Sequence, residues 1–487
     1  MDRLRSNPVD QFFVDLDDAA PHYPLHHTHV LRFHGAPPTR ERLAAHLASR
    51  LHLVPELGFR PGSPHGHWER SADAGLEAHL RIVRLGGGGH FGTRVGRQLG
   101  ARVGAQIGAP AGTRPGAYAT TAASAPATTP AGSAAGPRPA LPGTRAHLGT
   151  LPPPPAGPAP RTPDPVGADP EAGFARAVQA LLEASLSPLG PVWDIWLLEG
   201  WAPGEFAIAY RSHHAFQDAG AAGETTRRLF GPPDAEPVRA PRARPGRLAV
   251  LAHVPRVVAD LVTTRTRTRG SFVPPAGGHG TRVAVSEPVD LDQLRAIGEA
   301  HGASVNQVYL AGLCGALAGV FEERDPYVCV PMSTARPGDG LSGLGNRLSM
   351  LRVELPCAEP SPQRRMELIL RRTASARTPE RRACTSAMIG LCPDALARWT
   401  VRNYLQPRRT QLVASNRALP GGLSFDGIAA HTALFVPPLI PGHRGFCFFS
   451  TFERKARLAV VFPAGSANWP AVPERWLESL EELATLG

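Results

Sequence analysis

The sequence has few cysteines, a single lysine and no long apolar run. Its six cysteines all lie in the second half of the chain, and no two of them form a CxxC pair. This pattern is typical of reduced thiols in a cytoplasmic protein and argues against a disulfide framework or a zinc site. No apolar segment reaches the roughly 20 residues that a membrane-spanning helix needs. The opening residues, "MDRLRSNPVDQFFVDLDD", carry acidic side chains where a signal peptide requires an apolar run.

The chain carries an excess of positive charge, and its basic residues are spread along the sequence. The formal net charge is +11, and Lys455 is the only lysine, so the basic residues are almost all arginine. No zinc-finger spacing, aromatic RNA-binding signature or long basic arm accompanies them, so we expect no nucleic-acid partner. A mild attraction to anionic lipid headgroups explains the charge equally well. We therefore expect a cytoplasmic protein, with peripheral contact to the inner face of the membrane as an open alternative.

Glycine and proline divide the chain. They supply 51 and 52 of the 487 residues and are concentrated in particular stretches. Residues 86–170 consist mainly of Gly, Ala, Pro, Thr and Ser, a composition that buries too little apolar surface to offset its ordering entropy. We expect a disordered insertion there and a crossover linker at 236–280. The predicted folded parts are an N-terminal lobe at 1–235, which contains the insertion, and a C-terminal lobe at 281–487.

Both halves mix strands and helices. Alternating or continuous apolar residues predict strands, and apolar residues at helical spacing predict helices. The predicted strands are "HHTHVLRFHG", "HLRIVRL", "VWDIWLLEG", "EFAIAYRSHHA", "TRVAVSEPV", "YVCVPMS", "HTALFVPPL", "GFCFFSTFE" and "RLAVVFP". The predicted helices are "TRERLAAHLASRLHLVP", "FARAVQALLEASLSPLG", "DLDQLRAIGEAHG", "SVNQVYLAGLCGALAGVF" and "PERWLESLEELATLG". The sequence therefore predicts an α/β fold with mixed sheets.

One short stretch, "RSHHAFQDAGAA" at 211–222, has the composition of a catalytic motif. Successive side chains of a strand alternate between its two faces, so His214 shares a face with Ser212, whereas His213 points the other way with Arg211. The two histidines therefore cannot both reach one metal ion or one substrate atom. We expect no metal at this motif and a single functional imidazole, that of His214.

An imidazole titrates near neutral pH and can take a proton from a hydroxyl or amine that attacks an acyl carbon. A general base of this kind is typically worth roughly 10²–10⁴ in rate. Two adjacent histidines are also common as structural residues. The aspartate at Asp218 and the small residues after it leave the catalytic and the structural interpretation equally weighted on the residues alone.

The motif "HHAFQDA" is similar to the HHxxxDG motif of the condensation-domain superfamily of CoA- or carrier-dependent acyltransferases. Its surroundings resemble one branch, the wax ester synthase/diacylglycerol acyltransferase family. In chain order the resembling segments are "NPVDQFFVDLD", "PLHHTHVLRFHG", "GPVWDIWLLEG", "SVNQVYLAGLCGAL", "VPMSTARP…GLGNRLSMLRVELP" and "ASNRALPGG". Together they cover the chain from end to end apart from the 86–170 insertion.

The resemblance implies two chloramphenicol-acetyltransferase-like lobes with a tunnel between them and the HH motif, residues 213–219, at its middle. It implies that His214 is the general base, with His213 and Asp218 as the other residues of the catalytic motif, and that no cofactor is needed beyond acyl-CoA as a co-substrate. Asp218 would be structural and paired with Arg336 of "STARP". The resemblance also implies that three further residues support the site: Asn306, with its amide near the active site, Asn346 of "GNR" and Trp193 of the segment before the HH strand.

Some residues depart from the family pattern. Ala219 replaces the glycine of the HH motif, Gln307 replaces an aspartate, and Val192 replaces a leucine. These changes alter the walls of the site but remove no catalytic group.

The leading hypothesis is transfer of a fatty acyl group from acyl-CoA to a hydroxyl acceptor, either diacylglycerol, a long-chain alcohol or a hydroxylated metabolite. The first alternative is a condensation-type enzyme that uses a donor bound to a carrier protein and forms an ester or an amide. The second is a catalytically silent relative that serves as a binding or scaffold module. We expect a monomer or a homodimer.

Overall fold

The structure is a computed structural model. It describes residues 3–20, 23–62, 66–71, 75–85, 169–186, 190–232, 246, 248, 251–255, 280–321, 325–334, 343–374 and 379–486. Most of the predicted insertion at 86–170, most of the predicted linker at 236–280, and Arg336 lie outside the described residues.

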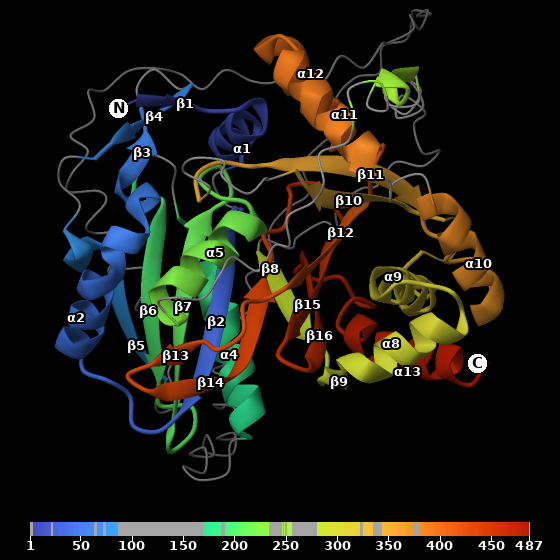
Figure 1. The fold of residues 1–487 in the computed structure, drawn as a ribbon. Coiled ribbons are helices and arrows are strands. Elements are labelled where there is room, and N and C mark those ends of the chain that lie inside the picture. The colour runs from blue at the N-terminus through green and yellow to red at the C-terminus, as the bar shows by residue number, and fades with distance from the viewer. Residues whose placement is uncertain are drawn as a thin grey trace, which may run out of the picture. The chain divides into compact units, whose positions relative to one another are not determined.

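Two large mixed sheets organise the described part of the chain (Figure 1). The first sheet has the strand order β13-β14-β2-β7-β6-β5. Its pairs are antiparallel except for β5 with β6, which are parallel. Its strands are β2 (His26–His34), β5 (Leu80–Arg84), β6 (Trp193–Glu199), β7 (Glu205–His213), β13 (Ser424–Phe425) and β14 (Ile428–Val436).

The second sheet has the order β11-β10-β12-β15-β16-β8, with β9 also pairing to β16. Its strands are β8 (Thr281–Val285), β9 (Val289–Asp290), β10 (Tyr327–Ser333), β11 (Leu348–Glu354), β12 (Leu412–Ala418), β15 (Gly445–Phe452) and β16 (Lys455–Pro463). A small third sheet has the order β1-β4-β3 and comprises β1 (Arg3–Arg5), β3 (Phe59–Pro61) and β4 (His67–Arg70).

Helices pack against these sheets, and several begin at capping residues. Asn7 caps α1, and Asp169 with the following proline begins α4. The helices are α1 (Pro8–Ala19), α2 (Arg40–Arg50), α4 (Pro170–Glu183), α5 (Ala219–Phe230), α8 (Leu291–Ala300), α9 (Val305–Leu317), α10 (Pro362–Thr373), α11 (Pro379–Leu391), α12 (Asp394–Tyr404) and α13 (Val472–Ala484). Short 3-10 turns lie at Leu51–Leu53, Pro55–Gly58 and Leu76–Ala78.

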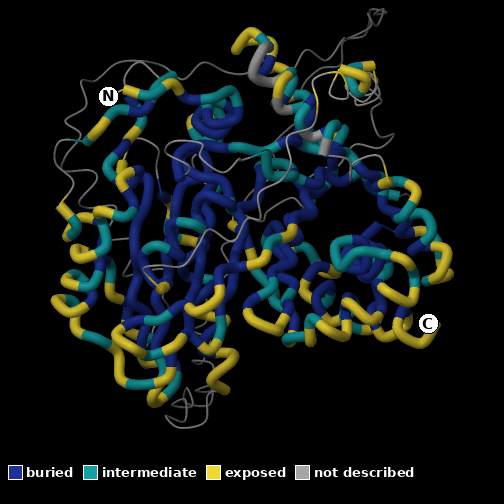
Figure 2. Tube along the Cα trace, in the orientation of Figure 1, coloured by how far each residue is buried: buried dark blue, intermediate teal, exposed yellow. Residues whose placement is uncertain are grey.

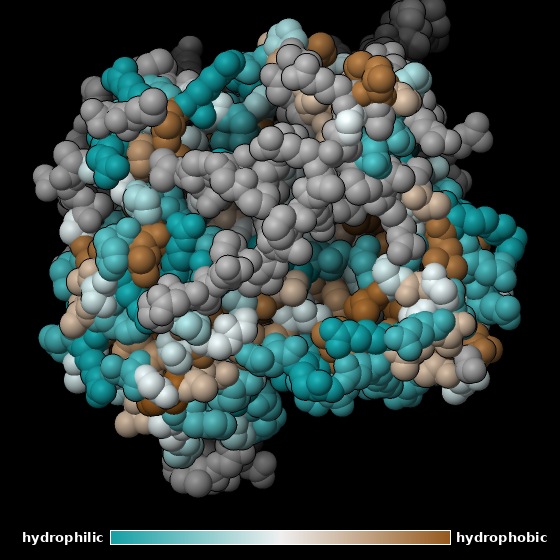
Figure 3. All heavy atoms as spheres, in the orientation of Figure 1, coloured by the Kyte–Doolittle hydropathy of each residue, from teal (hydrophilic) through white to brown (hydrophobic). Residues whose placement is uncertain are grey.

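Burial follows the sheets. Figure 2 shows the central strands as buried and the outer turns of the helices as exposed. Two apolar clusters form the core: one joins β2, β6 and β7 to one face of β15, and the other lies around α9, β15 and β16. On the face drawn in Figure 3, hydrophilic residues dominate over α10 and hydrophobic residues appear in small separate groups. α10 accordingly buries only one side, with Met366 and Ile369 inward and Arg364 and Arg371 exposed.

The predicted strands and helices are present, but the division into two lobes needs correction. β13 and β14 belong by sequence to the predicted C-terminal lobe, yet they extend the first sheet beside β2. The hydrophobic pattern of "HTALFVPPL" predicts a strand but cannot specify which sheet that strand joins, because strand pairing is a long-range contact. Helices α1, α10, α11 and α12 were not predicted either.

Candidate active site

The two faces of β7 carry different chemistry, as the alternation of the strand predicts. On one face Arg211 donates hydrogen bonds to the carboxylate of Asp194 at 2.8 and 2.7 Å and to the carbonyl of Leu181 in α4 at 2.7 Å. On the other face the hydroxyl of Tyr210 donates to Oε1 of Gln217 at 2.7 Å, on the α5 side. α4 and α5 therefore cover opposite faces of the strand that ends in the HH motif.

His214 follows β7 directly and lies between α1 and β2. Its imidazole stacks on Phe13 with the ring centroids 3.8 Å apart and the planes at 13°. The ring of His27 is tilted against it at 4.1 Å. The His214 backbone N–H donates to the carbonyl of Leu25 at 2.8 Å, which fixes the turn against the start of β2. Only 6% of His214 is exposed.

This environment keeps His214 uncharged. Burial lowers the pKa of His214 to about 4, and the nearby His213 also lowers it, whereas the charge of Asp218 acts in the opposite direction. At neutral pH the imidazole is therefore in the form that accepts a proton.

Both ring nitrogens of His213 contact other groups of the protein. It is fully buried, and its Nδ1 accepts the backbone N–H of Ala215 at 3.1 Å. The proton is therefore on Nε2, which lies 3.4 Å from Oδ1 of Asp17 in α1. His213 thus holds the turn and ties it to α1.

Asp218 is the N-cap of α5 and links two loops. Its Oδ1 accepts the backbone N–H of Ala221 at 2.8 Å, and its Oδ2 accepts the backbone N–H of Arg347 at 2.9 Å. The carboxylate therefore joins the HH turn to the "GNR" loop through main-chain donors. The predicted ion pair with Arg336 stays a prediction, because Arg336 lies outside the described residues.

Asn346 connects that loop to both the HH turn and the N-terminal helix. Its Nδ2 donates to the carbonyl of His214 at 2.7 Å and to Oδ1 of Asp10 at 2.9 Å, and its backbone N–H donates to the same oxygen at 2.7 Å. Its carbonyl accepts from the side chain of Asn7 at 2.8 Å. Asn346 is 4% exposed, so these bonds form in a dry environment.

Asp10 is the buried centre of this network, and the motif analysis did not single it out. Besides Asn346 it accepts the N–H of Asn7 at 3.0 Å, and Nε1 of Trp68 lies 3.5 Å away. Burial raises the pKa of Asp10 to about 6 against the opposing effect of these hydrogen bonds. Gly345 has a φ of 76°, and a Cβ there would lie 2.9 Å from Oδ2 of Asp10. Only glycine fits this turn so close to the carboxylate.

Gln217 forms a second set of hydrogen bonds next to the HH motif. Its Nε2 donates to Thr225 of α5 at 2.8 Å and to the carbonyl of Gly343 at 2.7 Å. Nε2 of His27 lies 3.1 Å from the Gln217 carbonyl. The side-chain amide therefore joins β7 and α5 to the distant segment at Gly343.

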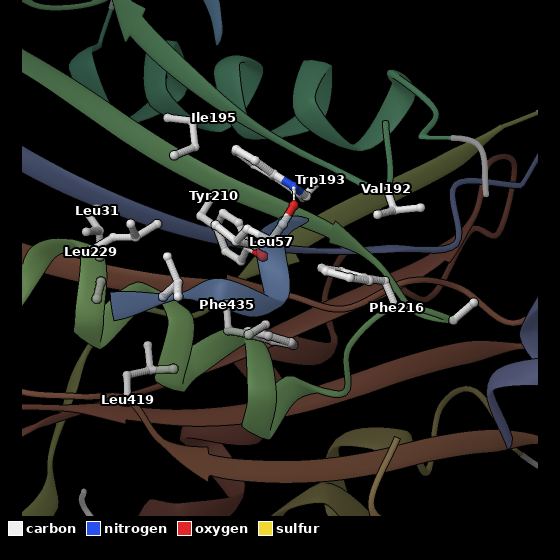
Figure 4. Close-up of a cluster of buried hydrophobic side chains, with 14 of the residues drawn as sticks. Leu31, Leu57, Val192, Trp193, Ile195, Tyr210, Phe216, Leu229, Leu419 and Phe435 are labelled. Atoms are coloured by element: carbon white, nitrogen blue, oxygen red, sulfur yellow. Dashed lines mark hydrogen bonds between the residues drawn. The ribbon is translucent and has the colours of Figure 1, made fainter. Parts of the chain in front are cut away.

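Asn306 and Trp193 form side-chain contacts with residues other than His214. Asn306, in the first turn of α9, accepts a hydrogen bond from Asn416 of β12 rather than contacting His214. Trp193 begins β6, donates from Nε1 to the carbonyl of Leu57 at 2.9 Å and stacks on His79 with centroids 3.7 Å apart. Figure 4 shows this tryptophan within the buried cluster, so it supports the sheet.

The departures from the family motif are accommodated locally. Ala219 is the first residue of α5, and its φ is not positive, so its methyl group causes no backbone strain. Gln307 completes a capping box with Ser304 and donates to Thr373 at 2.8 Å. The neutral amide of Gln307 takes the place of an acidic side chain in this capping box and still forms its hydrogen bonds. The Val192 carbonyl accepts the backbone N–H of His213 at 2.8 Å, a bond that does not depend on its side chain.

Sequence reasoning missed three residues around His214. Phe13 and Asp10 lie within "NPVDQFFVDLD", and His27 lies within "PLHHTHVLRFHG", both already noted as resembling the family. Asn7 with Asp10 three residues later has the spacing of a capping box, a signal that was available but does not indicate contact with Asn346.

Comparison with known proteins agrees with this geometry. Residues 170–267 match the model of the wax ester synthase/diacylglycerol acyltransferase catalytic domain. A protein of Mycobacterium tuberculosis named as a diacylglycerol O-acyltransferase is 26% identical over 246 residues, which cover 42% of this chain and 54% of that protein. An O-acyltransferase of Acinetobacter baylyi is 27% identical over 220 residues, 37% of this chain and 47% of the relative. The chain thus spans about half the length of the curated relatives it matches.

Solved structures share the fold over nearly the whole chain. The wax ester synthase/diacylglycerol acyltransferase of Marinobacter aquaeolei VT8 has a TM-score of 0.55 and 14% identity, with 99% of both chains covered. The first condensation domain of the CDA synthetase has a TM-score of 0.57 and 14% identity, covering 99% of this chain and 96% of that one. Every helix in the described part of the chain is too short or too polar to cross a membrane.

The predicted α/β fold with mixed sheets is confirmed by these neighbours, and the central tunnel stays a prediction. The matched segment contains β6, β7, the HH turn and α5, whereas the other resembling segments lie outside it. Residues 170–267 are thus similar to the wax ester synthase/diacylglycerol acyltransferase catalytic domain, and the chain shares its fold with a solved enzyme of that name and with a solved condensation domain.

Proposed function

We propose that the protein is an O-acyltransferase that moves a fatty acyl group from acyl-CoA to a hydroxyl acceptor. One observation carries the proposal: the imidazole of His214 is buried, uncharged and held between Phe13 and His27. The acceptors that fit the family are diacylglycerol, a long-chain alcohol or a hydroxylated metabolite.

The proposed reaction needs one proton shuttle. The acceptor hydroxyl attacks the thioester carbonyl while His214 takes its proton, and a tetrahedral oxyanion forms. The intermediate then expels the thiolate of CoA, and the imidazolium returns the proton to that sulfur. No protein nucleophile and no cofactor takes part, because the acceptor attacks directly.

Asn346 is the residue best placed to orient this base. Nδ1 of His214 and Oδ1 of Asn346 are both buried and have no partner among the described residues. An N–H donor and a carbonyl acceptor are complementary, so a small rotation of the imidazole pairs them. That hydrogen bond would place the remaining proton on Nδ1 and leave the lone pair of Nε2 for the substrate. Asn346 is then a positioning residue rather than a catalytic one.

Asp218 and Asn306 have more remote roles in this proposal. Asp218 caps α5 and steadies the HH turn, and its charge helps to stabilise the imidazolium that forms during transfer. Asn306, paired with Asn416, belongs to the wall supplied by the second sheet, and a direct contact with substrate stays a prediction. The donors that stabilise the oxyanion are not assigned.

A condensation-type reaction is the second candidate, and the fold favours it nearly as strongly. The TM-scores of 0.57 to a condensation domain and 0.55 to the wax ester synthase are equivalent. In this alternative a carrier protein delivers the acyl group, and the product is an ester or an amide. The base and its supports are the same in both.

One experiment separates these functions. Purified protein is incubated with acyl-CoAs of graded chain length and a panel of alcohols and amines, and products are identified by mass spectrometry. Esters that form with acyl-CoA and disappear in His214→Ala support the leading proposal. Products that require an acyl-carrier protein support the alternative, and no product with either donor supports a silent scaffold.

We also infer a cytoplasmic protein with peripheral contact to an anionic membrane through α12. Leu396 and Trp399, three residues apart, are each 51% exposed. Arg398 and Arg402 flank them, and Arg402 also pairs with Asp15 at 3.1 Å. Exposed apolar residues among arginines favour the interface of a lipid bilayer. Flotation with anionic vesicles is expected to recover the protein, and Trp399→Ala is expected to weaken recovery. Recovery unchanged in that variant would contradict the assignment to α12.

A further inference from the structure

A second group of histidines lies at the opposite end of the strands that hold the HH motif. β2 runs from His26, beside His213, to His34, which pairs with Glu205 at the start of β7. Eight strand steps of about 3.3 Å separate the two ends, or about 26 Å. On its other side β2 pairs with β14, which carries His431.

A β-bulge aims His431 at this pair. The register passes from Ala430 opposite Phe33 to Thr432 opposite Arg32, so His431 is the extra residue of β14 with no partner on β2. Bulges of this kind redirect a side chain. The imidazole of His431 stacks on that of His34 with centroids 4.0 Å apart and planes at 11°.

The three side chains present ligand atoms to a common point. One nitrogen from each histidine and one oxygen of Glu205 all lie within 4.8 Å of one another, and Nδ1 of His34 is 3.7 Å from Oε1 of Glu205. In a tetrahedral zinc site with bonds of about 2.1 Å the ligand atoms are about 3.4 Å apart. The side chain of His34 is 69% exposed, so it can rotate to close this difference.

Neighbouring groups hold two of the ligands in place. The other oxygen of Glu205, Oε2, accepts from Nε of Arg32 at 2.7 Å and from Nε1 of Trp201 at 3.3 Å, which leaves Oε1 for an ion. Oγ1 of Thr432 lies 3.1 Å from Nδ1 of His431. If the hydroxyl accepts the Nδ1 proton, the lone pair of Nε2 is available, the arrangement typical of metal-binding histidines.

The charges of the neighbouring side chains are compatible with a bound cation. Arg32 also pairs with Glu171 at 2.6 Å, so its single positive charge is shared between two carboxylates. The net charge of the three groups is −1. Among the residues that the structure describes, this is the one place where three potential ligands come together in this way.

We propose that His34, Glu205 and His431 bind one zinc ion, with solvent at the fourth position. Two imidazole nitrogens and a carboxylate oxygen match the ligand preference of zinc. The ion would join β14, from the second half of the chain, to β2 and β7, from the first half. Its role would be structural, because the cluster lies about 26 Å from the end of β2 beside the HH motif.

The test uses the full chain without a histidine tag, stripped with EDTA. Zinc chloride is titrated in competition with a chromophoric chelator, and the melting temperature is measured with and without zinc. The variants are His34→Ala and His431→Ala, and the matched control is His52→Ala, an exposed histidine outside the cluster.

We expect the wild type and His52→Ala to bind one zinc ion and to melt at a higher temperature when zinc is present. Both cluster variants should bind at least about tenfold more weakly and lose the rise in melting temperature. A wild type that binds no zinc, or cluster variants that bind as tightly as the wild type, would overturn the proposal.

Discussion

The two ends of the β2–β7 pair contain the same residue type in opposite environments. At one end, His26, His27, His213 and His214 are buried under α1, α4 and the "GNR" loop. At the other end, His34 and His431 are exposed at the edge of the sheet. The difference shows that the surroundings of a histidine, rather than its presence in a motif, decide which chemistry it can perform.

The buried end is suited to proton transfer, whereas the exposed end is suited to binding a cation. Burial disfavours the protonated imidazole because its charge is poorly solvated, so the buried ring is uncharged and can accept a proton. An exposed pair beside a carboxylate keeps access to solvent and to ions. Each prediction below changes one side of this contrast.

The largest effect is expected from His214→Ala. Acyl transfer should fall by about 10²–10⁴ while the melting temperature changes little, because the ring contacts Phe13 and His27 but anchors no hydrogen-bond network. His213→Ala is the matched comparison. It should lower the melting temperature by removing the acceptor for Ala215 N–H, yet retain more activity. Steady-state kinetics and thermal melting of both variants test this, and equal total loss of turnover in two well-folded proteins would refute it.

Asn346→Ala should affect both stability and activity. The truncation removes the donor to the buried carbonyl of His214, at a cost of about 1–3 kcal/mol, and one of the donors to Asp10, which keeps its backbone hydrogen bonds. Urea denaturation measures the loss, and Asn468→Ala, an exposed asparagine that bonds one carbonyl, is the control. The pH–rate profile should also shift if Asn346 orients the base. A variant as stable as the control would show that the network does not hold the site.

Asp218→Ala should cost more than the removal of an ordinary cap. A helix N-cap is worth about 0.5–2 kcal/mol, and this buried carboxylate also satisfies Arg347 N–H. Asp169→Ala, the exposed cap of α4 with one backbone bond, is the matched control. A double-mutant cycle with Arg336→Ala tests the predicted ion pair. Additive losses would mean that the two side chains do not meet.

Acid should destabilise the fold through the buried histidines. Burial lowers the pKa of His214 to about 4 and of His29 to about 3, and holds His26 and His27 well below 6.5. The unfolded chain takes up these protons below about pH 6.5 and the folded chain does not, so stability is lost as the pH falls from 6.5 toward 4. Each extra proton contributes about 1.4 kcal/mol per pH unit.

The titration of Asp10 has the opposite effect on the pH dependence of stability. Its pKa is raised to about 6, so the folded state binds a proton that the unfolded state lacks between about pH 4 and 6, and its contribution falls as pH rises. Four histidines outweigh one aspartate. Urea midpoints at pH 7.5, 6.5, 5.5 and 4.5 should therefore decrease in that order, and a constant midpoint would contradict the burial of these rings.

The smallest effect is expected at the exposed end. Without zinc, His34→Ala should change stability by less than about 0.5 kcal/mol and leave transfer unchanged, as is usual for surface substitutions. Denaturation in EDTA with parallel kinetics measures this. A large loss in the absence of metal would mean that the stacked histidines already stabilise the sheet, which would weaken the contrast between the two ends.

The sequence by itself determined the strand that carries the HH motif, the opposite directions of His213 and His214, and the resemblance of the motif to the acyltransferase family. These follow from local periodicity and from residues that are adjacent in the chain. The strands "HHTHVLRFHG" and "HTALFVPPL" were predicted as strands for the same reason, but not as neighbours.

Tertiary structure alone decided what surrounds His214. Phe13, His27 and Asn346 contact it from distant segments, and Asp10 holds Asn346 from 336 residues away in the chain. The bulge that brings His431 to His34 depends on the pairing of β14 with β2. Burial also set the protonation state of the base, because desolvation depends on everything packed around a group and not on its sequence neighbours. Local patterns fix which way a side chain leaves the backbone, whereas the contacts that give it a role are made over long distances in the chain.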